Sequence, residues 1–302
     1  MHYSEGGDMS RDLKRLPKIV IYLVLILICC ICVIPIITVV SISLSSDLTI
    51  MKEGYGILPK DFTTEAYRYV FKDWVSIIRS YGVSLFVTVF GCAAGLILNA
   101  LMAYVLSRHD YAYRKQLTLV LTIPMVLNGG LVPTYIWLTK YMHLKNTIWV
   151  MIVPMLVVPW FIILLRTFFS QIPYSLIEAA TVDGAGEMTI FARIILPLSK
   201  PALATVGMFI TLNYWNDWFL PLMYIDKREL YNLQYRLYIM MRDVQEMIKN
   251  SAMSGMGISV ADIPTESMRM AMCVVAAGPM LMVFPFFQKY FVKGLTVGGV
   301  KG

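Results

Sequence analysis

Six long apolar stretches constrain this chain more than any other feature of its 302 residues. A bilayer core about 30 Å thick is crossed by a helix of roughly 20 apolar residues, and each stretch meets or approaches that length. Only one of them contains a charged residue, Asp217. The stretches cover residues 19–44, 81–106, 117–138, 148–165, 202–225 and 270–287. We therefore predict an all-α, polytopic membrane protein with six transmembrane helices.

The composition agrees with this prediction and excludes an ordinary soluble enzyme. Hydrophobic residues make up 58% of the chain and charged residues 15%, against about 45–50% and about 25% in soluble domains. The formal net charge of +7 belongs to the flanks of apolar segments, so we expect membrane lipid as a partner and no nucleic acid.

Basic residues in the short flanks predict the orientation of the chain. Short cytoplasmic segments are enriched in Lys and Arg, and such residues occur in segments 1–18, 108–115 and 288–302. We expect a cell-membrane protein with a cytoplasmic N-terminal tail (1–18) and a cytoplasmic C-terminal tail (288–302). The permease domain between them covers residues 19–287. The first apolar stretch is too long for a cleaved signal peptide and is read as a retained helix.

Two packing features lie inside the apolar stretches. Eight of the fourteen prolines fall there and predict bent helices, because each proline removes a backbone donor. Gly91 and Gly95 form a G-x-x-x-G pair, which permits close contact between helices.

The sequence carries none of the common enzyme motifs. The dipeptide Gly-Lys of a Walker loop, a G-x-S-x-G elbow and an H-E-x-x-H pair are all absent. The five cysteines lie in apolar runs and the three histidines are scattered. We therefore predict no catalytic residues, no metal site and no cofactor in this subunit.

The most informative segment is a predicted helical hairpin, residues 171–201. Pro173 suits the start of a first helix, and Asp183-Gly184 suits its end, because glycine readily adopts the left-handed conformation. A second helix is expected over 185–196, ended by Pro197. We expect the hairpin to protrude and to pack on the bundle through an apolar stripe, with Glu178 facing outward. That stripe consists of Met188, Phe191, Ile195 and Leu198.

The residues of this hairpin resemble a motif of a known family. Glu178-Ala179-Ala180, Asp183-Gly184-Ala185, Ile194, Pro197 and Pro201 are similar to the cytoplasmic "EAA" loop of permease subunits of binding-protein-dependent ABC importers. The resemblance covers almost the whole chain and is to the maltose-type carbohydrate permeases. It continues, in order, through Leu58-Pro59, Ala103-Tyr104 with Arg108, Pro133-Thr134-Tyr135, Asn146-Thr147, Trp215-Asn216, Pro221-Leu222 and the tail Gly298-Gly299-Val300-Lys301-Gly302.

The resemblance implies a type I ABC importer permease fold and a set of partners. These are a second homologous permease, two ATP-binding subunits that carry ATP and Mg, and an extracellular sugar-binding protein. Glu178, Ala179, Ala180, Asp183, Gly184, Ala185 and Pro197 would couple this subunit to the ATPase. Gly299, Val300 and Lys301 would reach toward the ATPase pair. Segment 263–269 resembles oligosaccharide permeases that pair with a second, different permease, which implies a heterodimer.

A polar group interrupts the fifth apolar stretch. Asn213, Asn216 and Asp217 fall at i, i+3 and i+4, so a continuous helix would place them on one face. Tyr214, Trp215 and Trp218 lie beside them. An acid inside a membrane helix is costly and points to the bundle interior or a wet cavity. We predict that these six residues contribute to the substrate pathway, because a sugar needs an apolar platform for its C–H face and polar partners for its hydroxyl groups. The alternative is a structural or gating role for the Trp-Asn pair.

Together these observations predict a non-catalytic permease subunit of an ATP-driven sugar importer, forming half of the pathway for an oligosaccharide. Two alternatives remain open. One is the same machine for another solute, such as an amino acid, a polyamine or phosphate. The other is an ATP-independent channel or scaffold that carries a helical hairpin.

Overall fold

The computed structural model describes residues 6–127, 129–254 and 265–298. Within these ranges every regular element is a helix, and the one β-type contact is an isolated bridge between Ser45 and Phe62. The all-α prediction is confirmed. The chain divides into two compact units, residues 1–72 with 244–275 and residues 73–243 with 276–302.

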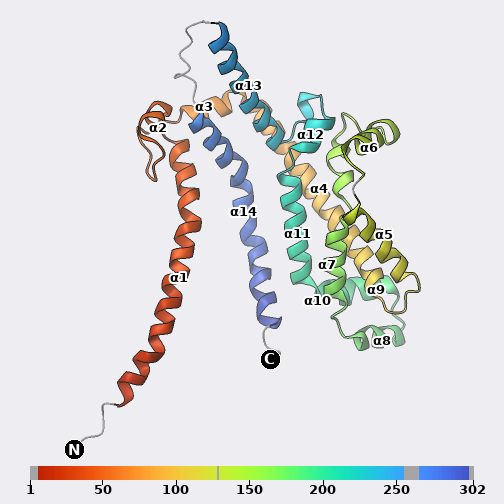
Figure 1. The fold of residues 1–302 in the computed structure, drawn as a ribbon. Helices are drawn as coiled ribbons and strands as arrows, with labels where there is room; N and C mark the ends of the chain where they lie inside the picture. The colour runs from red at the N-terminus through yellow and green to blue at the C-terminus, as the bar shows by residue number, and fades with distance from the viewer. Residues whose placement is uncertain (1–5, 128, 255–264, 299–302) are drawn as a thin grey trace, which may run out of the picture. The chain divides into compact units, whose positions relative to one another are not determined.

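The helices are named here in chain order and drawn in Figure 1. The long ones are α1 (Gly6–Ser43), α4 (Trp74–Ser107), α13 (Leu233–Ser254) and α14 (Glu266–Gly298). Those of intermediate length are α5 (Arg114–Val126), α7 (Pro159–Phe169), α8 (Tyr174–Val182) and α11 (Lys200–Trp215). The short α-helices are α2 (Asp47–Glu53), α3 (Glu65–Val70), α6 (Leu131–Ile136), α9 (Glu187–Ile190), α10 (Leu196–Leu198) and α12 (Phe219–Tyr224). The 3-10 helices are η1 (Phe71–Asp73), η3 (Ile148–Met151), η4 (Val153–Met155) and η6 (Arg228–Leu230), and two π-helices are η2 (Trp137–Tyr141) and η5 (Phe191–Ile195).

Three helical segments of the described chain are long and apolar enough to cross a membrane: Val20–Ser43, Glu65–Ser107 and Glu266–Gln288. Three further helix pairs pass the same test only when each bent pair is counted as one span, which raises the number to six at most. Helix α1 begins at Gly6, inside the predicted N-terminal tail.

The bends occur where the sequence breaks the helical hydrogen-bond ladder. η3 and η4 meet α7 at 46°, and Pro159 is the first residue of α7. Val158 is extended, as expected for a residue that precedes proline. Asn99 of α4 is fully buried and repairs this break: its Nδ2 donates to Leu156 O (2.8 Å), and its Oδ1 accepts from Val158 N (3.0 Å). A side chain thus satisfies backbone groups that the bend sets free.

The core of the second unit forms around α4, which packs against α11 and α7. The predicted G-x-x-x-G contact is confirmed. A Cβ built on Gly91 would lie 2.5 Å from the ring of Tyr214, and one on Gly95 would lie 3.3 Å from Leu156 O. Only glycine lets these neighbours approach so closely.

In the first unit, Asp47 fixes the start of α14. Its Oδ1 accepts hydrogen bonds from the backbone N–H of Glu266 (3.0 Å) and Ser267 (3.1 Å), and its Oδ2 accepts from the Ser267 hydroxyl (2.6 Å). Asp47 is 9% exposed, so this buried carboxylate acts as an N-cap supplied from another helix.

Candidate functional site

The predicted hairpin is present and turns at Gly184. The first helix, α8, ends at Val182, and Gly184 adopts φ +79°. Gly184 N donates to Thr181 O (3.0 Å), and Ala185 N donates to Ala180 O (2.9 Å). These two bonds form a Schellman motif, which satisfies the last carbonyls of α8. The sequence-based position of the turn is therefore confirmed.

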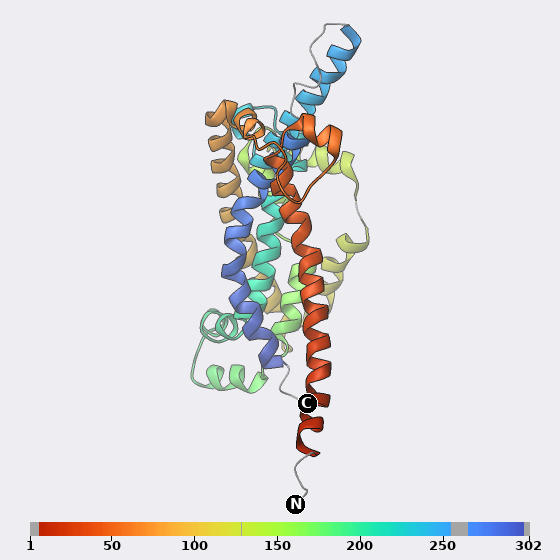
Figure 2. The same cartoon turned by 90° about the vertical axis from the view of Figure 1, so that its left-hand side faces the viewer.

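The two faces of α8 differ sharply. Ile177 is buried (7% exposed), and Ala180 packs against the core. Glu178 and Ala179 are exposed on the other side, and Val182 is 87% exposed. In both views of the ribbon, α8 lies at the end of the second unit away from α6 and α12 (Figures 1 and 2). The Glu178 face of α8 is thus exposed in the described chain.

The second half of the hairpin packs through a different stripe from the predicted one. Phe191 and Ile195 are buried as expected, but Met188 is 66% exposed and Leu198 is 55% exposed. Ile190 is buried in their place. The hairpin also contains η5, a π-helical turn that interrupts the regular α-helical spacing between Phe191 and Ile195. Pro197 does not stop the helix, which continues to Leu198 before an 85° bend into α11.

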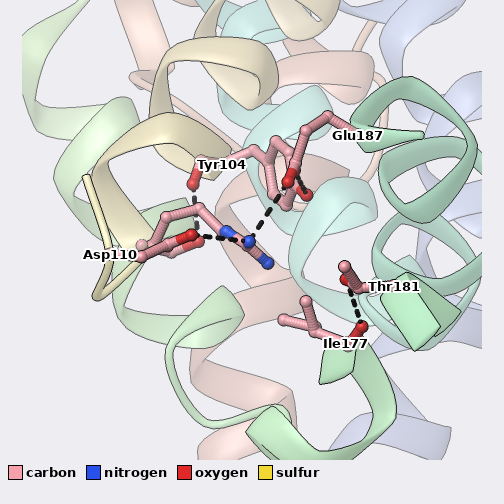
Figure 3. A network of polar contacts seen from close by, with 7 residues as sticks. Tyr104, Asp110, Ile177, Thr181 and Glu187 are labelled. Carbon is pink, nitrogen blue, oxygen red and sulfur yellow. Dashed lines mark hydrogen bonds and ion pairs between the residues drawn. The ribbon is translucent and has the colours of Figure 1, made fainter. Parts of the chain in front are cut away.

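A polar cluster joins the hairpin to the end of α4. The Glu187 carboxylate accepts hydrogen bonds from the Tyr104 hydroxyl and from Arg108 Nη2 (3.1 Å). Arg108 Nη2 also donates to Asp110 (2.9 Å), and its guanidinium lies 5.7 Å from the ring centroid of Tyr174. Figure 3 shows Tyr104, Asp110 and Glu187 converging. We call Tyr104, Arg108 and Glu187 the Arg108 latch.

Sequence reasoning did not identify Glu187 as a functional residue. Its partners are 79 and 83 residues away in the chain. The available signal was the position of Glu187, three residues after the turn glycine, together with a lone Arg at the end of an apolar helix.

In the fifth predicted span the polar residues do not share one helical face. α11 ends at Trp215, so Asn216 and Asp217 lie beyond it, in the break before α12. Asp217 Oδ1 accepts from the first two backbone N–H groups of α12, both at 3.1 Å, and therefore caps that helix. The helix is interrupted here because the Asp217 carboxylate, in place of backbone carbonyls of a preceding turn, accepts from the first N–H groups of α12.

Two of the predicted pathway residues are core residues. Tyr214 is 2% exposed, and its hydroxyl donates to Ile152 O (2.9 Å). Trp215 is also 2% exposed, and its Nε1 donates to Ala276 O (2.9 Å). Both side chains are held by backbone carbonyls inside the second unit.

Three of the remaining pathway residues are exposed in this chain, and Asp217 is half-buried. Asn213 and Asn216 are exposed. Trp218 is 43% exposed and stacks on Tyr238 of α13, with ring centroids 5.0 Å apart. An exposed amide pair beside stacked rings is chemically suited to hydroxylated ligands, since it offers both hydrogen-bonding groups and an apolar face.

Two further predictions concern the C-terminal tail and metal binding. Gly299, Val300 and Lys301 lie outside the described residues. Among the described residues, no group of three or more His, Cys, Asp or Glu side chains is placed to hold a metal ion.

Several apolar helices, some of them bent, and a short hairpin at one end of the second unit are the features expected of a type I ABC importer permease fold. The comparison with known families agrees: the family described as "Binding-protein-dependent transport system inner membrane component" matches residues 9–297. The chain belongs to this family, which confirms the identification from the hairpin motif. Its members are transport subunits of the inner membrane.

Similar proteins extend over nearly the whole chain. Protein LplC of Bacillus subtilis (strain 168) is 37% identical over 86% of this chain and 86% of its own length. The polygalacturonan/rhamnogalacturonan transport system permease protein YtcP of the same strain is 37% identical over 84% of this chain and 87% of its own. A chain of a solved bacterial ABC transporter involved in the import of the acidic polysaccharide alginate is 27% identical, with a TM-score of 0.75, over 96% of this chain and 100% of that one.

Proposed function

We propose that this chain is the permease subunit of an ATP-driven importer of sugars, with oligosaccharides as the substrate class. The similarity to permeases named for the transport of polygalacturonan and rhamnogalacturonan, and to an alginate importer, supports this assignment. The chain supplies half of the translocation pathway through six spans, counting each bent helix pair as one, and both termini are cytoplasmic. It contributes no catalytic residue, metal or cofactor of its own.

The observation that carries the proposal is the exposed face of α8 around Glu178. The hairpin is anchored on its inner side by Ile177 and turned by Gly184, while Glu178 and Ala179 are exposed. A carboxylate on a rigid, protruding helix gives a charge-assisted hydrogen bond to a basic group of a partner. That partner is an ATP-binding subunit, and Asp183, Ala180, Ala185 and Pro197 shape the hairpin that docks on it.

The other partners follow from the same architecture. A second homologous permease completes the pathway in a heterodimer, a second ATP-binding subunit completes the ATPase pair, and an extracellular sugar-binding protein delivers the substrate. We propose that Asn213, Asn216, Asp217 and Trp218 line the pathway, whereas Tyr214 and Trp215 support it from the core. ATP binding then switches the cavity between its inward and outward openings as a rigid-body transition.

Copurification tests the proposal. The tagged chain is isolated in a mild detergent from membranes of its native cell, as wild type, as Glu178→Lys and as the control Glu229→Lys, which reverses another exposed acid. We expect a second permease and an ATPase with wild type and the control, and loss of the ATPase alone with Glu178→Lys.

Three results would each contradict a part of the proposal. An ATPase that stays bound to Glu178→Lys would refute the role of Glu178. No ATPase with wild type in several mild detergents would favour an ATP-independent channel or scaffold. A companion binding protein that takes up amino acids, polyamines or phosphate would correct the substrate class.

A further inference from the structure

In the Arg108 latch, the carboxylate of Glu187 on the hairpin accepts hydrogen bonds from two donors. Glu187 Oε1 accepts from Arg108 Nη2 at 3.1 Å, and Oε2 accepts from the Tyr104 hydroxyl. Tyr104 lies in the last turn of α4 and Arg108 directly follows that helix, four positions later, on the same side. Two donors on one helix end and two acceptor oxygens on one side chain fix both the position and the orientation of the carboxylate.

The same arginine also contacts the first helix of the hairpin. Its guanidinium lies 5.7 Å from the ring centroid of Tyr174, which is within the range of a cation–π contact. Tyr174 is the first residue of α8, and Glu187 is the first residue of α9. One side chain therefore contacts the start of both hairpin helices.

Burial protects one side of this contact from water. Arg108 is 8% exposed and Tyr104 is 6% exposed, whereas the Glu187 side chain is 61% exposed. Interactions of partly buried charges are screened much less than those on the surface. Arg108 Nη1 is buried without a hydrogen-bond partner in the described chain, so the guanidinium depends on Nη2 for its bonds to acids.

α4 is the helix against which both α11 and α7 pack, so a shift of its end reaches the core of the second unit. Packed helices respond to displacement as bodies and are not continuously deformable. We propose that Arg108 and Glu187 transmit movement of the hairpin to α4, with Arg108 as a positioning residue that acts through Glu187. This inference rests on the proposed function, because the movement originates in the ATPase.

The test uses the complete transporter in proteoliposomes and measures ATP hydrolysis and solute uptake on the same preparation. Glu187→Gln keeps the size of the side chain and removes its charge. We expect the ATPase to copurify in the wild-type amount and the ATP consumed per solute molecule to rise at least fivefold. Tyr104→Phe removes one hydrogen bond and leaves the ion pair, so a smaller rise is expected.

Asp110→Asn is the matched control. Asp110 also accepts from Arg108 (2.9 Å), but it lies shortly after α4 in the chain and is not part of the hairpin. We expect its coupling ratio to stay within twofold of wild type. The exchange Arg108→Glu with Glu187→Arg restores the pair in reverse, and we expect it to recover at least half of the lost coupling.

Three outcomes would overturn the inference. An equal ratio of ATP consumed to solute transported in Glu187→Gln and Asp110→Asn would mean that the latch transmits nothing. Loss of the ATPase from Glu187→Gln would mean that Glu187 merely maintains the docking surface. Absence of an ATPase from wild type would overturn the proposed function and the latch together. This outcome differs from failure of the latch alone, because the unmodified transporter then shows no ATP-driven uptake either.

Discussion

Replacing Gly91 by alanine should destabilise the protein, although alanine is the better helix former. Gly91 lies in α4, and the added Cβ would stand 2.5, 2.6 and 2.8 Å from three carbons of the Tyr214 ring. Carbon atoms normally pack at about 3.5–4.0 Å, so the ring has to retreat by roughly 1 Å. Tyr214 is 2% exposed, so a displaced ring would have to move within the protein interior.

The magnitude follows from three contributions. Overpacking a well-packed core costs about 1–3 kcal/mol. Retreat of the ring breaks the bond from the Tyr214 hydroxyl to Ile152 O (2.9 Å), and leaving such a buried pair unsatisfied costs about 1–3 kcal/mol. Alanine recovers about 0.8–1.0 kcal/mol of helix propensity. The sum is a loss of roughly 1–5 kcal/mol in the free energy of unfolding.

The assay is unfolding of the detergent-purified chain, followed by tryptophan fluorescence, for Gly91→Ala and Gly82→Ala. Gly82 lies in the same helix, and a Cβ there meets nothing within 4 Å. We expect Gly82→Ala to be as stable as wild type or slightly more stable. Tyr214→Phe measures the hydrogen-bond contribution alone. Equal stability of Gly91→Ala and Gly82→Ala would refute the packing argument.

Three other changes test separate parts of the structure. Gly184→Ala places a side chain at φ +79° in open space, so backbone strain alone should cost about 1–2 kcal/mol; hydrogen exchange at the end of α8 should quicken, and Gly184→Asn should quicken it less. Asp47→Ala removes the cap of α14, which should cost about 0.5–2 kcal/mol and increase proteolysis near Ser267, whereas unchanged proteolysis would contradict the cap. The hydrogen bond from Lys145 (3.0 Å) lowers the pKa of Asp226. The pair therefore stabilises the fold at pH values above the usual aspartate pKa, and this stabilisation is lost as the pH falls through the lowered pKa. Wild type should melt at a higher temperature than Asp226→Asn at pH 7 and at the same temperature near pH 3, and a pH-independent difference would contradict the ion pair.

Local chemistry made part of this structure predictable. The apolar stretches predicted the helices, because length and hydrophobicity decide which segments enter a bilayer. Gly184 predicted the hairpin turn, since few other residues adopt its conformation. The Gly91 and Gly95 pair predicted a close contact, although not its partner. The "EAA" resemblance then led to the family.

The unpredicted features depend on contacts between distant residues. The π-turn of η5 leaves no mark in the hydrophobic period and interrupts the regular helical spacing of the hairpin. The break after Trp215 is stabilised by Asp217, which the helical pattern had placed inside a continuous span. The bond between Arg108 and Glu187 joins two residues that are 79 positions apart in the sequence. Such pairs are set by tertiary packing, which a single sequence does not reveal.

The central claim is that ATP drives a sugar through this subunit by way of the Glu178 hairpin. The most direct measurement is uptake of a labelled oligosaccharide, chosen from the ligand of the copurified binding protein, into proteoliposomes that contain the complete transporter. The account predicts uptake that requires ATP and that is abolished in Glu178→Lys but retained in Glu229→Lys. Uptake without ATP, or uptake at the wild-type rate in Glu178→Lys, would contradict it.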